Sequence, residues 1–222
     1  MGYRLDGKDI DIVQKRMTKI GTGATGDVYK YKNKALKIFK EGKTPPMDLE
    51  TAKYLSDIST SNILLPEDIL FDNLMFRGYT YKLVSKKGLG KRMITLPKEE
   101  LIDNIEVLES DTETLSKKNV LLNGIDPSNS IFNGSIYLCD PSEYSILEIM
   151  STKELERLNK YQIHMLLSMM ILSEMRKSNL GGRPEREMKT LLELKDMDEN
   201  TSTYLKRLLK NSESIKQFVK KM

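Results

Sequence analysis

Short apolar runs separated by polar breaks dominate the first third of the 222-residue chain. Runs of this length, bounded by Asn, Asp, Gly and Pro, are typical of antiparallel β-strands. We therefore predict a small antiparallel sheet of about five strands in this part of the chain. The apolar runs cover residues 28–31, 35–39, 63–65, 69–71 and 75–84.

One helix is expected within this strand-rich part. Pro45 and Pro46 suit the first turn of a helix, because proline needs no hydrogen-bond partner for a backbone N–H there. The helix should run from about Met47 to about Ile58. After the last apolar run, residues 85–90 are polar and contain glycine, which is typical of a hinge between two parts of a structure.

Helical spacing of apolar residues marks the second half of the chain. Residues 97–108 form one such segment, and a capping-box pattern at 151–154 precedes a long helix that should end near Arg176. Two more helices are expected at 185–194 and 203–219. We therefore expect the second half to be mainly helical.

One hairpin is expected among these helices. An Asn-Gly pair at 133–134 lies between the apolar runs 131–132 and 136–138. Asn-Gly favours a tight two-residue turn, since both residues tolerate positive φ. The hairpin should bring Asn129, before its first strand, next to Asp140, after its second.

The stretch 20–28 contains three glycines in the pattern G-x-G-x-x-G-x-V. Glycines allow backbone N–H groups to approach an anion closely, because no Cβ intervenes. Lys37 lies in the apolar run 35–39, the second run after the glycines, and would supply a fixed positive charge. We therefore predict a phosphate-binding loop.

The residues that follow the glycines separate two kinds of nucleotide site. A dinucleotide-binding fold requires a helix at this point. Here residues 28–31 and 35–39 have the pattern of two strands of a hairpin, with Lys37 on the second. The order favours a kinase-like nucleotide site over a dinucleotide site.

Asn129 and Asp140 are the candidate metal ligands. An amide oxygen and a carboxylate beside a phosphate-binding loop suit Mg2+, which prefers oxygen ligands and keeps its other positions for water and phosphate oxygens. The alternative is that both residues simply end strands, where Asn and Asp are common.

Taken in this order, these features make residues 19–140 resemble the protein-kinase-like superfamily. The resemblance implies an α+β, two-lobed protein-kinase-like fold. A small antiparallel β-sheet N-lobe would cover residues 1–84, and a mainly helical C-lobe would cover residues 85–222. ATP and Mg2+ would be the cofactors and would bind between the lobes.

The resemblance also implies roles for single residues. Lys37 would contact the α- and β-phosphates, Glu50 on the first helix would hold Lys37, and Asn129 with Asp140 would bind magnesium. The backbone of 82–84 would border the adenine. For Glu50 the alternative is an exposed surface glutamate. The expected cofactor-binding residues are Gly21, Thr22, Gly23, Gly26, Val28, Ala35, Lys37, Glu50, Lys82 and Val84.

The catalytic loop departs from the family pattern. The family motif is H-R-D-x-x-x-x-N, and Asn129 matches its last residue. An alignment without a gap then places Gly124 at the position of the catalytic aspartate. Asp126 is the remaining carboxylate in the loop, and we expect it to orient a substrate hydroxyl. The alternative is a turn residue before Pro127. Residues 141–142 are Pro-Ser in place of Phe-Gly, and no A-P-E sequence follows.

The expected activity is that of an atypical kinase, which transfers the γ-phosphate of ATP to a hydroxyl, with protein Ser or Thr as the first choice of acceptor. Lys37 and the metal are expected to matter more than the base, because positioning and charge neutralisation supply most of the rate. Two alternatives stay open. One is a pseudokinase that binds ATP and a partner protein, and the other is a small-molecule kinase of the kind that modifies antibiotics or sugars.

Composition argues against several other classes. The net charge of +4 arises from 36 basic and 32 acidic residues spread along the chain, so nucleic-acid binding is not expected, although residues 216–221 are locally basic. Cys139 is the single cysteine and Met1 to Asp6 lack the apolar core of a signal peptide, which favours a reducing, cytoplasmic setting. The apolar stretch 165–172 is too short to cross a bilayer, so no membrane segment is expected.

Two further residues occur once in the chain. His164 is the single histidine and lies on an apolar helical stretch, so we expect a core residue and not a catalyst. Cys139 directly precedes Asp140 and should face the nucleotide pocket or pack beneath it.

Overall fold

The computed structural model describes residues 3–10, 16–84 and 98–177. These residues form a mixed α+β structure whose largest element is a seven-stranded sheet in the order β2-β1-β6-β7-β5-β4-β3. Every neighbouring pair in it is antiparallel. The strands are β1 (Tyr3–Leu5), β2 (Lys8–Ile10), β3 (Lys19–Thr22), β4 (Gly26–Tyr31), β5 (Lys34–Phe39), β6 (Ile69–Asp72) and β7 (Met75–Lys82).

The sheet is larger than the expected one of about five strands. Strands β1 and β2 form an additional hairpin whose turn residues, Asp6 and Gly7, both have positive φ. Residues 63–65 were expected to form a strand, and this prediction is wrong. Ile63, Leu64 and Leu65 are all buried and make only an isolated bridge from Ile63 to Leu138. They form an apolar run because they cross the core, not because they join the sheet.

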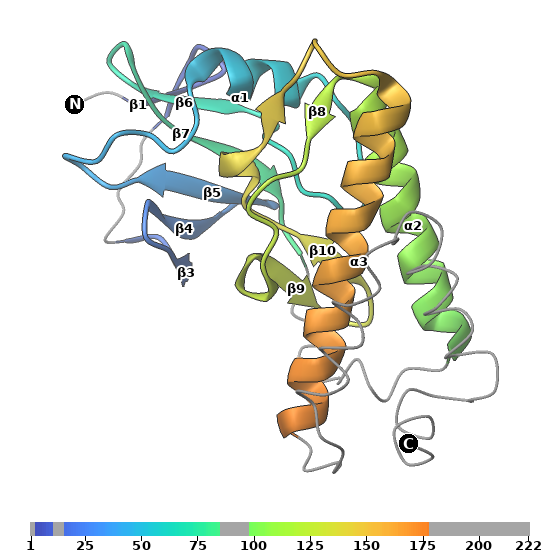
Figure 1. Ribbon diagram of the computed structural model, residues 1–222. Coiled ribbons are helices and arrows are strands. Elements are labelled where there is room, and N and C mark those ends of the chain that lie inside the picture. The colour runs from blue at the N-terminus through green and yellow to red at the C-terminus, as the bar shows by residue number, and fades with distance from the viewer. Residues whose placement is uncertain (1–2, 11–15, 85–97, 178–222) are drawn as a thin grey trace.

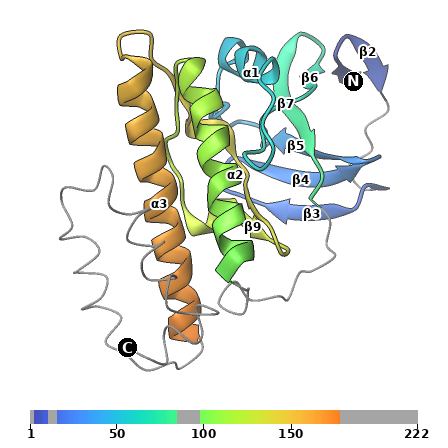
Figure 2. The ribbon, with the colours of Figure 1, turned by 90° about the vertical axis from the view of Figure 1, so that its right-hand side faces the viewer.

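Helix α1 (Leu49–Ser56) lies within the predicted range and begins after Asp48, whose carboxylate accepts a hydrogen bond from the backbone N–H of Thr51 at 2.7 Å. Ala52 and Leu55 are buried on one face of this helix. The other two α-helices of the described ranges are α2 (Lys98–Lys117) and α3 (Thr152–Lys177). They pack side by side at the opposite end of the molecule from β1 and β2 (Figures 1 and 2).

The start of α3 is the predicted capping box. The Ser151 backbone N–H donates to the Glu154 carboxylate at 3.0 Å, and the Glu154 N–H donates back to the Ser151 hydroxyl at 3.3 Å. His164 of this helix is buried, as expected, and its Nε2 lies 2.8 Å from Oε1 of Glu109 on α2. None of the helices in the described ranges is long and apolar enough to cross a membrane.

The second half of the structure also contains short strands and 3-10 helices. The prediction that this half is mainly helical is therefore wrong for the residues that the structure describes, because strand pairs and loops lie between its two long helices. The helices expected at 185–194 and 203–219, and the hinge at 85–90, lie outside the described residues. The short elements are β8 (Val120–Leu121), η3 (Pro127–Asn129), β9 (Ser130–Phe132), β10 (Ile136–Leu138), η4 (Pro141–Glu143) and β11 (Ser145–Ile146).

The segment from Ser61 to Leu64 joins the two halves. Both oxygens of the buried Asp111 carboxylate on α2 accept hydrogen bonds from the backbone N–H groups of residues 61–63, at 2.7 to 2.9 Å. On the other side, the Leu64 N–H donates to the Leu138 carbonyl at 2.7 Å, and the Leu138 N–H donates to the Asn62 carbonyl at 2.9 Å. These bonds hold the β9–β10 hairpin to residues 62–64, and residues 61–63 to α2.

Candidate functional site

A cavity of about 340 Å³ lies between the glycine stretch and the β9–β10 hairpin. Small-molecule sites are usually pockets of about 300 to 1,000 Å³, so this one has room for a ligand. In Figure 1 the hairpin lies next to the β3–β5 side of the sheet, which brings the two walls of the cavity together. The lining residues are Ile20, Gly21, Thr22, Gly23, Gly26, Val28, Ala35, Lys37, Tyr81, Leu83, Val84, Ser128, Asn129, Ile131, Cys139 and Asp140.

Most residues selected from the sequence meet in this cavity. The glycines, Lys37 and the two candidate metal ligands all line it, although Lys37 and Asp140 are 103 positions apart in the chain. Glu50, Lys82 and Asp126 lie elsewhere. The selected residues that line the cavity are Gly21, Thr22, Gly23, Gly26, Val28, Ala35, Lys37, Val84, Asn129 and Asp140.

Lys37 lies on β5, a strand that is paired on both sides, with Val28 and Tyr79 as its register partners. Its side chain is only 5% exposed, and its Nζ lies 2.5 Å from Oδ1 of Asp140. A buried ammonium is costly unless a partner compensates for the water it has lost. The Lys37–Asp140 ion pair supplies that compensation at the cavity wall.

Asp140 is ionised and held in an unusual backbone conformation. Burial raises the pKa of this carboxyl, but the charge and hydrogen bond of Lys37, together with hydrogen bonds from Ser142, outweigh it, and the net pKa is lowered. The φ and ψ angles of Asp140 are 73° and 71°, in the left-handed region. This region costs a non-glycine residue roughly 1 kcal/mol, and Asp tolerates it better than most. Backbone strain of this kind is common at ligand sites.

The predicted hairpin forms, but its turn contains three residues, 133–135, and not two, because Phe132 pairs with Ile136. Of the Asn-Gly pair, Gly134 has positive φ and Asn133 does not. The hairpin places Asn129 opposite Cys139. The Asn129 carbonyl accepts hydrogen bonds from the Cys139 N–H at 2.8 Å and from its Sγ at 3.2 Å. The amide Nδ2 of Asn129 donates to the Gly124 carbonyl at 3.2 Å. That bond uses the amide nitrogen, so the amide oxygen is the atom that can bind a cation. Asn129 and Asp140 therefore present two oxygen donors at the open end of the hairpin.

This donor set fits a magnesium ion that shares its ligands with phosphates. Mg2+ in nucleotide sites is held by one or two side-chain oxygens, with the remaining positions taken by water and phosphate oxygens. Within the described ranges, no group of three or more His, Cys, Asp or Glu side chains is arranged to hold a metal ion. A cation held by Asn129 and Asp140 would therefore have to take its remaining ligands from water or from a bound molecule.

The glycine stretch forms a tight loop from β3 into β4. The Gly23 N–H donates to the Gly26 carbonyl at 2.8 Å, and the Lys40 Nζ donates to the Gly23 carbonyl at 2.7 Å. A Cβ at Gly26 would lie 2.8 Å from the Ile38 carbonyl oxygen, so only glycine lets β4 pass this close to β5. Lys40 was not selected from the sequence, although it is the next lysine after Lys37 on the same segment.

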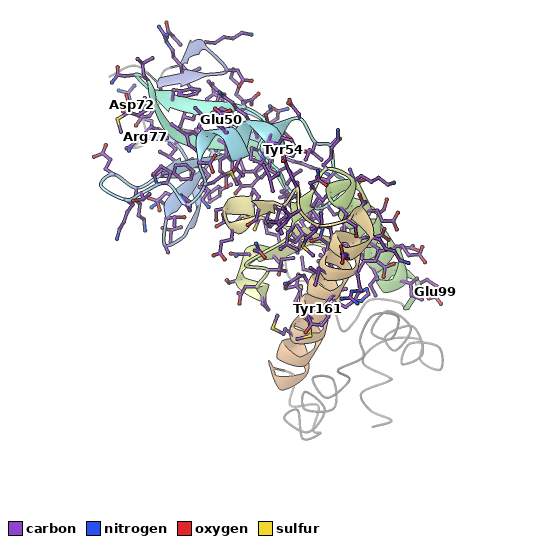
Figure 3. The ribbon with its side chains drawn as sticks, turned by 45° about the horizontal axis from the view of Figure 1, so that its top comes forward. Glu50, Tyr54, Asp72, Arg77, Glu99 and Tyr161 are labelled. Carbon is purple, nitrogen blue, oxygen red and sulfur yellow. The ribbon has the colours of Figure 1, made fainter. Side chains whose placement is uncertain are left out.

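Glu50 does not pair with Lys37, so the expected Lys37–Glu50 ion pair is wrong for this structure. Its side chain is 82% exposed and its Oε1 lies 3.0 Å from the Nζ of Lys53, one turn along α1. Glu50 lies in the first turn of α1, on the face opposite the buried Ala52 and Leu55 (Figure 3). The alternative of a surface glutamate describes this residue.

Lys82 and Asp126 also lie outside the cavity lining. Lys82 is exposed at the end of β7, and its Nζ donates to the Ser61 carbonyl at 3.0 Å, while the neighbouring Leu83 and Val84 line the cavity. Asp126 is exposed and caps η3, since its Oδ1 accepts a hydrogen bond from the Ser128 N–H at 2.7 Å. Hydrogen bonds from Ser128 lower the pKa of Asp126. Asp126 thus acts as a turn residue in this structure.

The cavity combines two kinds of lining. The apolar surface comes from Ile20, Val28, Ala35, Leu83 and Ile131. The polar and charged surface comes from Thr22, Lys37, Asn129 and Asp140. Such a combination suits a ligand with a flat apolar part and an anionic part. Sequence reasoning missed Ile131 and Tyr81, although both lie on predicted strands. Successive side chains of a strand point to opposite faces, so every second residue of each strand could have been assigned to the face that lines the cavity.

Comparison with known proteins gives no family assignment. No model of a known protein family matches the chain, and a search of curated proteins finds no match either. The functional assignment therefore depends on the geometry of the site itself.

Proposed function

We propose that this protein is an ATP- and Mg2+-dependent phosphotransferase with the two-lobed architecture of the protein-kinase-like enzymes. It transfers the γ-phosphate of ATP to a hydroxyl. The observation that carries the proposal is the Lys37–Asp140 ion pair in the wall of a ligand-sized cavity. A lysine next to a glycine loop, facing an Asn and an Asp at the end of a hairpin, is the arrangement expected of a phosphoryl-transfer site.

Each group in the cavity has a role in this proposal. The apolar residues, among them Ala35 and Val84, would enclose the adenine. The glycine loop would cover the phosphates, and Lys37 would neutralise charge on the α- and β-phosphates. The oxygens of Asn129 and Asp140 would hold magnesium. The bound metal would neutralise negative charge that develops on the transferring phosphoryl group.

Protein Ser or Thr is the acceptor that we propose first, and a reducing, cytoplasmic setting is part of the same proposal, since Cys139 is the single cysteine. A pseudokinase that binds ATP and a partner protein is the second candidate. It is favoured by Gly124, which lacks a side chain at the position of the usual base, and by Asp126, whose carboxylate is engaged with the Ser128 N–H. A small-molecule acceptor is the third.

Transfer of labelled γ-phosphate tests the proposal. The full chain is incubated with Mg-ATP and a generic protein acceptor, and incorporation into the chain and the acceptor is measured. We expect transfer by the natural chain and its loss in Asp140→Asn. Asp72→Asn is the matched control, because Asp72 ends β6 at the β6–β7 turn (Figure 3) and does not line the cavity.

The outcomes separate the candidates. Thermal stabilisation by Mg-ATP without transfer to any protein or to sugar and aminoglycoside hydroxyls favours the pseudokinase. Neither stabilisation nor transfer contradicts the proposed function altogether.

A further inference from the structure

A carboxylate from another segment fills the place where a side chain at position 124 would point. Gly124 lies between β8 and η3 and has a φ of 63°. A Cβ built on Gly124 would collide with the carboxylate of Glu143 and lie 2.9 Å from the Glu143 Cβ. The Glu143 side chain therefore packs directly against the backbone of Gly124.

Glu143 lies close in the chain to one candidate metal ligand and packs against a residue bonded to the other. It is the last residue of η4, the 3-10 helix that starts directly after Asp140. On the other side, the Gly124 carbonyl accepts the hydrogen bond from the Asn129 amide at 3.2 Å. Glu143 is exposed and is not part of the cavity lining. Glu143 thus comes three residues after Asp140 in the chain and packs against Gly124, the residue whose carbonyl holds the Asn129 amide.

Two carboxylates near this point compete for the role of a base. The Asp126 carboxylate is engaged, because it caps η3 through the Ser128 N–H. Among the described residues, the Glu143 carboxylate has no hydrogen-bond or ion-pair partner. A general base must be free to accept a proton and lie within hydrogen-bond reach of the hydroxyl that donates it. On the first criterion Glu143 is the better candidate of the two, because Oδ1 of Asp126 already accepts the Ser128 N–H.

We propose that Glu143 is the catalytic base of the phosphotransferase, and that it takes the role left vacant by Gly124. This inference rests on the proposed function. In the transfer step, the acceptor oxygen forms a bond to the γ-phosphorus while the bond from the γ-phosphorus to the β,γ-bridging oxygen breaks. The electron pair of that bond leaves with ADP, and the hydroxyl proton passes to the Glu143 carboxylate and then to water.

The location of Glu143 gives a reason for the glycine at 124. An Asp at 124 would need a Cβ in the space that the Glu143 carboxylate occupies. It would also adopt a φ of 63°, which is unfavourable for most L-residues. Gly124 and Glu143 are therefore complementary, with one supplying space and the other supplying the carboxylate.

The test uses the full chain with Mg-ATP and casein as acceptor. Glu143→Gln removes the base but keeps the size of the side chain. Glu148→Gln is the matched control, because Glu148 is an exposed glutamate a few residues further along. Asp126→Asn tests the competing carboxylate. Two readouts are taken for each variant, the initial rate at saturating Mg-ATP and the thermal shift on addition of Mg-ADP, which reports nucleotide binding without turnover.

We expect Glu143→Gln to lower the maximal rate by about 100-fold or more, the usual contribution of a general base. The thermal shift of Glu143→Gln with Mg-ADP should equal that of the natural chain. Glu148→Gln should have the maximal rate and the thermal shift of the natural chain. A rate within about threefold of the natural chain for Glu143→Gln overturns the inference. A large loss in Asp126→Asn combined with a normal rate in Glu143→Gln assigns the role to Asp126 and overturns it as well.

The same experiment separates this inference from the proposed function. If the natural chain transfers phosphate and Glu143→Gln does so equally well, the phosphotransferase stands and Glu143 is not its base. If the natural chain transfers no phosphate, the proposed function is wrong, and the role of Glu143 is wrong with it.

Discussion

The ammonium of Lys37 and the carboxylate of Asp140 lie 2.5 Å apart, although 103 residues separate them in the chain. Lys37 comes from the middle of the sheet and Asp140 from the end of the β9–β10 hairpin. The lysine side chain is 5% exposed and the aspartate side chain 30%. The pair therefore joins the two walls of the cavity and fixes two opposite charges where a ligand would bind.

Asp140→Asn should destabilise the protein. The substitution leaves the Lys37 ammonium buried without its counter-charge, and breaking a buried pair on one side typically costs about 3 to 5 kcal/mol, with the lower value expected here because Asp140 is partly exposed. Asn tolerates the left-handed backbone at this position, so the backbone does not contribute to the loss.

The free energy of unfolding from urea denaturation measures this effect. The double variant Lys37→Met with Asp140→Asn should recover part of the lost stability, because neither charge then remains buried. A loss below about 1 kcal/mol in Asp140→Asn contradicts the importance of the pair.

The contribution of the Lys37–Asp140 pair to the free energy of unfolding should decrease as the pH falls into the acidic range. The folded-state pKa of Asp140 is lowered from its ordinary value of 3.8, so the unfolded chain takes up the proton first as the pH falls. The stabilisation is fully present above the ordinary pKa and is lost as the pH falls through the lower, folded-state pKa.

The difference in unfolding free energy between the natural chain and Asp140→Asn isolates this group from the other carboxylates. It should be constant near neutral pH and shrink below about pH 4. A difference that stays constant down to about pH 2.5 is inconsistent with a lowered pKa.

Local signals in the sequence predicted most elements around the site. The capping box before α3, the Asn-Gly turn of the β9–β10 hairpin and the strands on both sides of the glycine loop all depend on residues close together in the chain. The β1–β2 hairpin was missed although Asp6-Gly7 is an equally strong turn signal. Its strands have only three residues each and contain charged side chains, so they lack an apolar run.

Features set by tertiary packing were harder to predict. Residues 63–65 have the composition of a strand but cross the core without joining the sheet. A short apolar run in the sequence looks the same whether it forms a strand or a buried connection. Glu50 was expected to face Lys37, but the buried face of α1 carries Ala52 and Leu55 and turns Glu50 to solvent. Glu143 has no sequence signal of its own, because its contact with Gly124 arises only when two loops meet.

Two glycines of the loop should respond differently to substitution by alanine. At Gly26 a Cβ would lie 2.8 Å from the Ile38 carbonyl oxygen, so strands β4 and β5 must separate, at a cost of about 1 to 3 kcal/mol. At Gly23 the nearest contact is 3.6 Å, which is ordinary van der Waals distance, and the change should be within about 0.5 kcal/mol.

Urea denaturation without nucleotide measures both variants. Equal stabilities for Gly23→Ala and Gly26→Ala disagree with the close approach of the two strands.

Cys139 should react slowly with thiol reagents in the folded protein. Burial, and next the negative charge of Asp140, raise the pKa of its thiol to about 11. At pH 8 only about one molecule in a thousand then carries the reactive thiolate. We expect labelling in urea to be faster by about 100-fold or more.

Mg-ATP should slow the labelling of the folded protein further, because Cys139 lines the cavity. The rate is followed by absorbance with a chromogenic disulfide reagent. Labelling that nucleotide does not affect speaks against this location of the thiol, and equal rates in buffer and urea speak against its burial.

Calorimetric titration of the full chain with ATP in the presence of magnesium tests most directly whether Lys37, Asn129 and Asp140 form one nucleotide site. We predict a single binding event in the natural chain. The affinity should fall when magnesium is chelated, and Lys37→Met and Asp140→Asn should each weaken it by at least about tenfold, the equivalent of 1.4 kcal/mol. A natural chain that folds normally and releases no heat with Mg-ATP, or that binds ATP equally well without Lys37 and Asp140, contradicts the account.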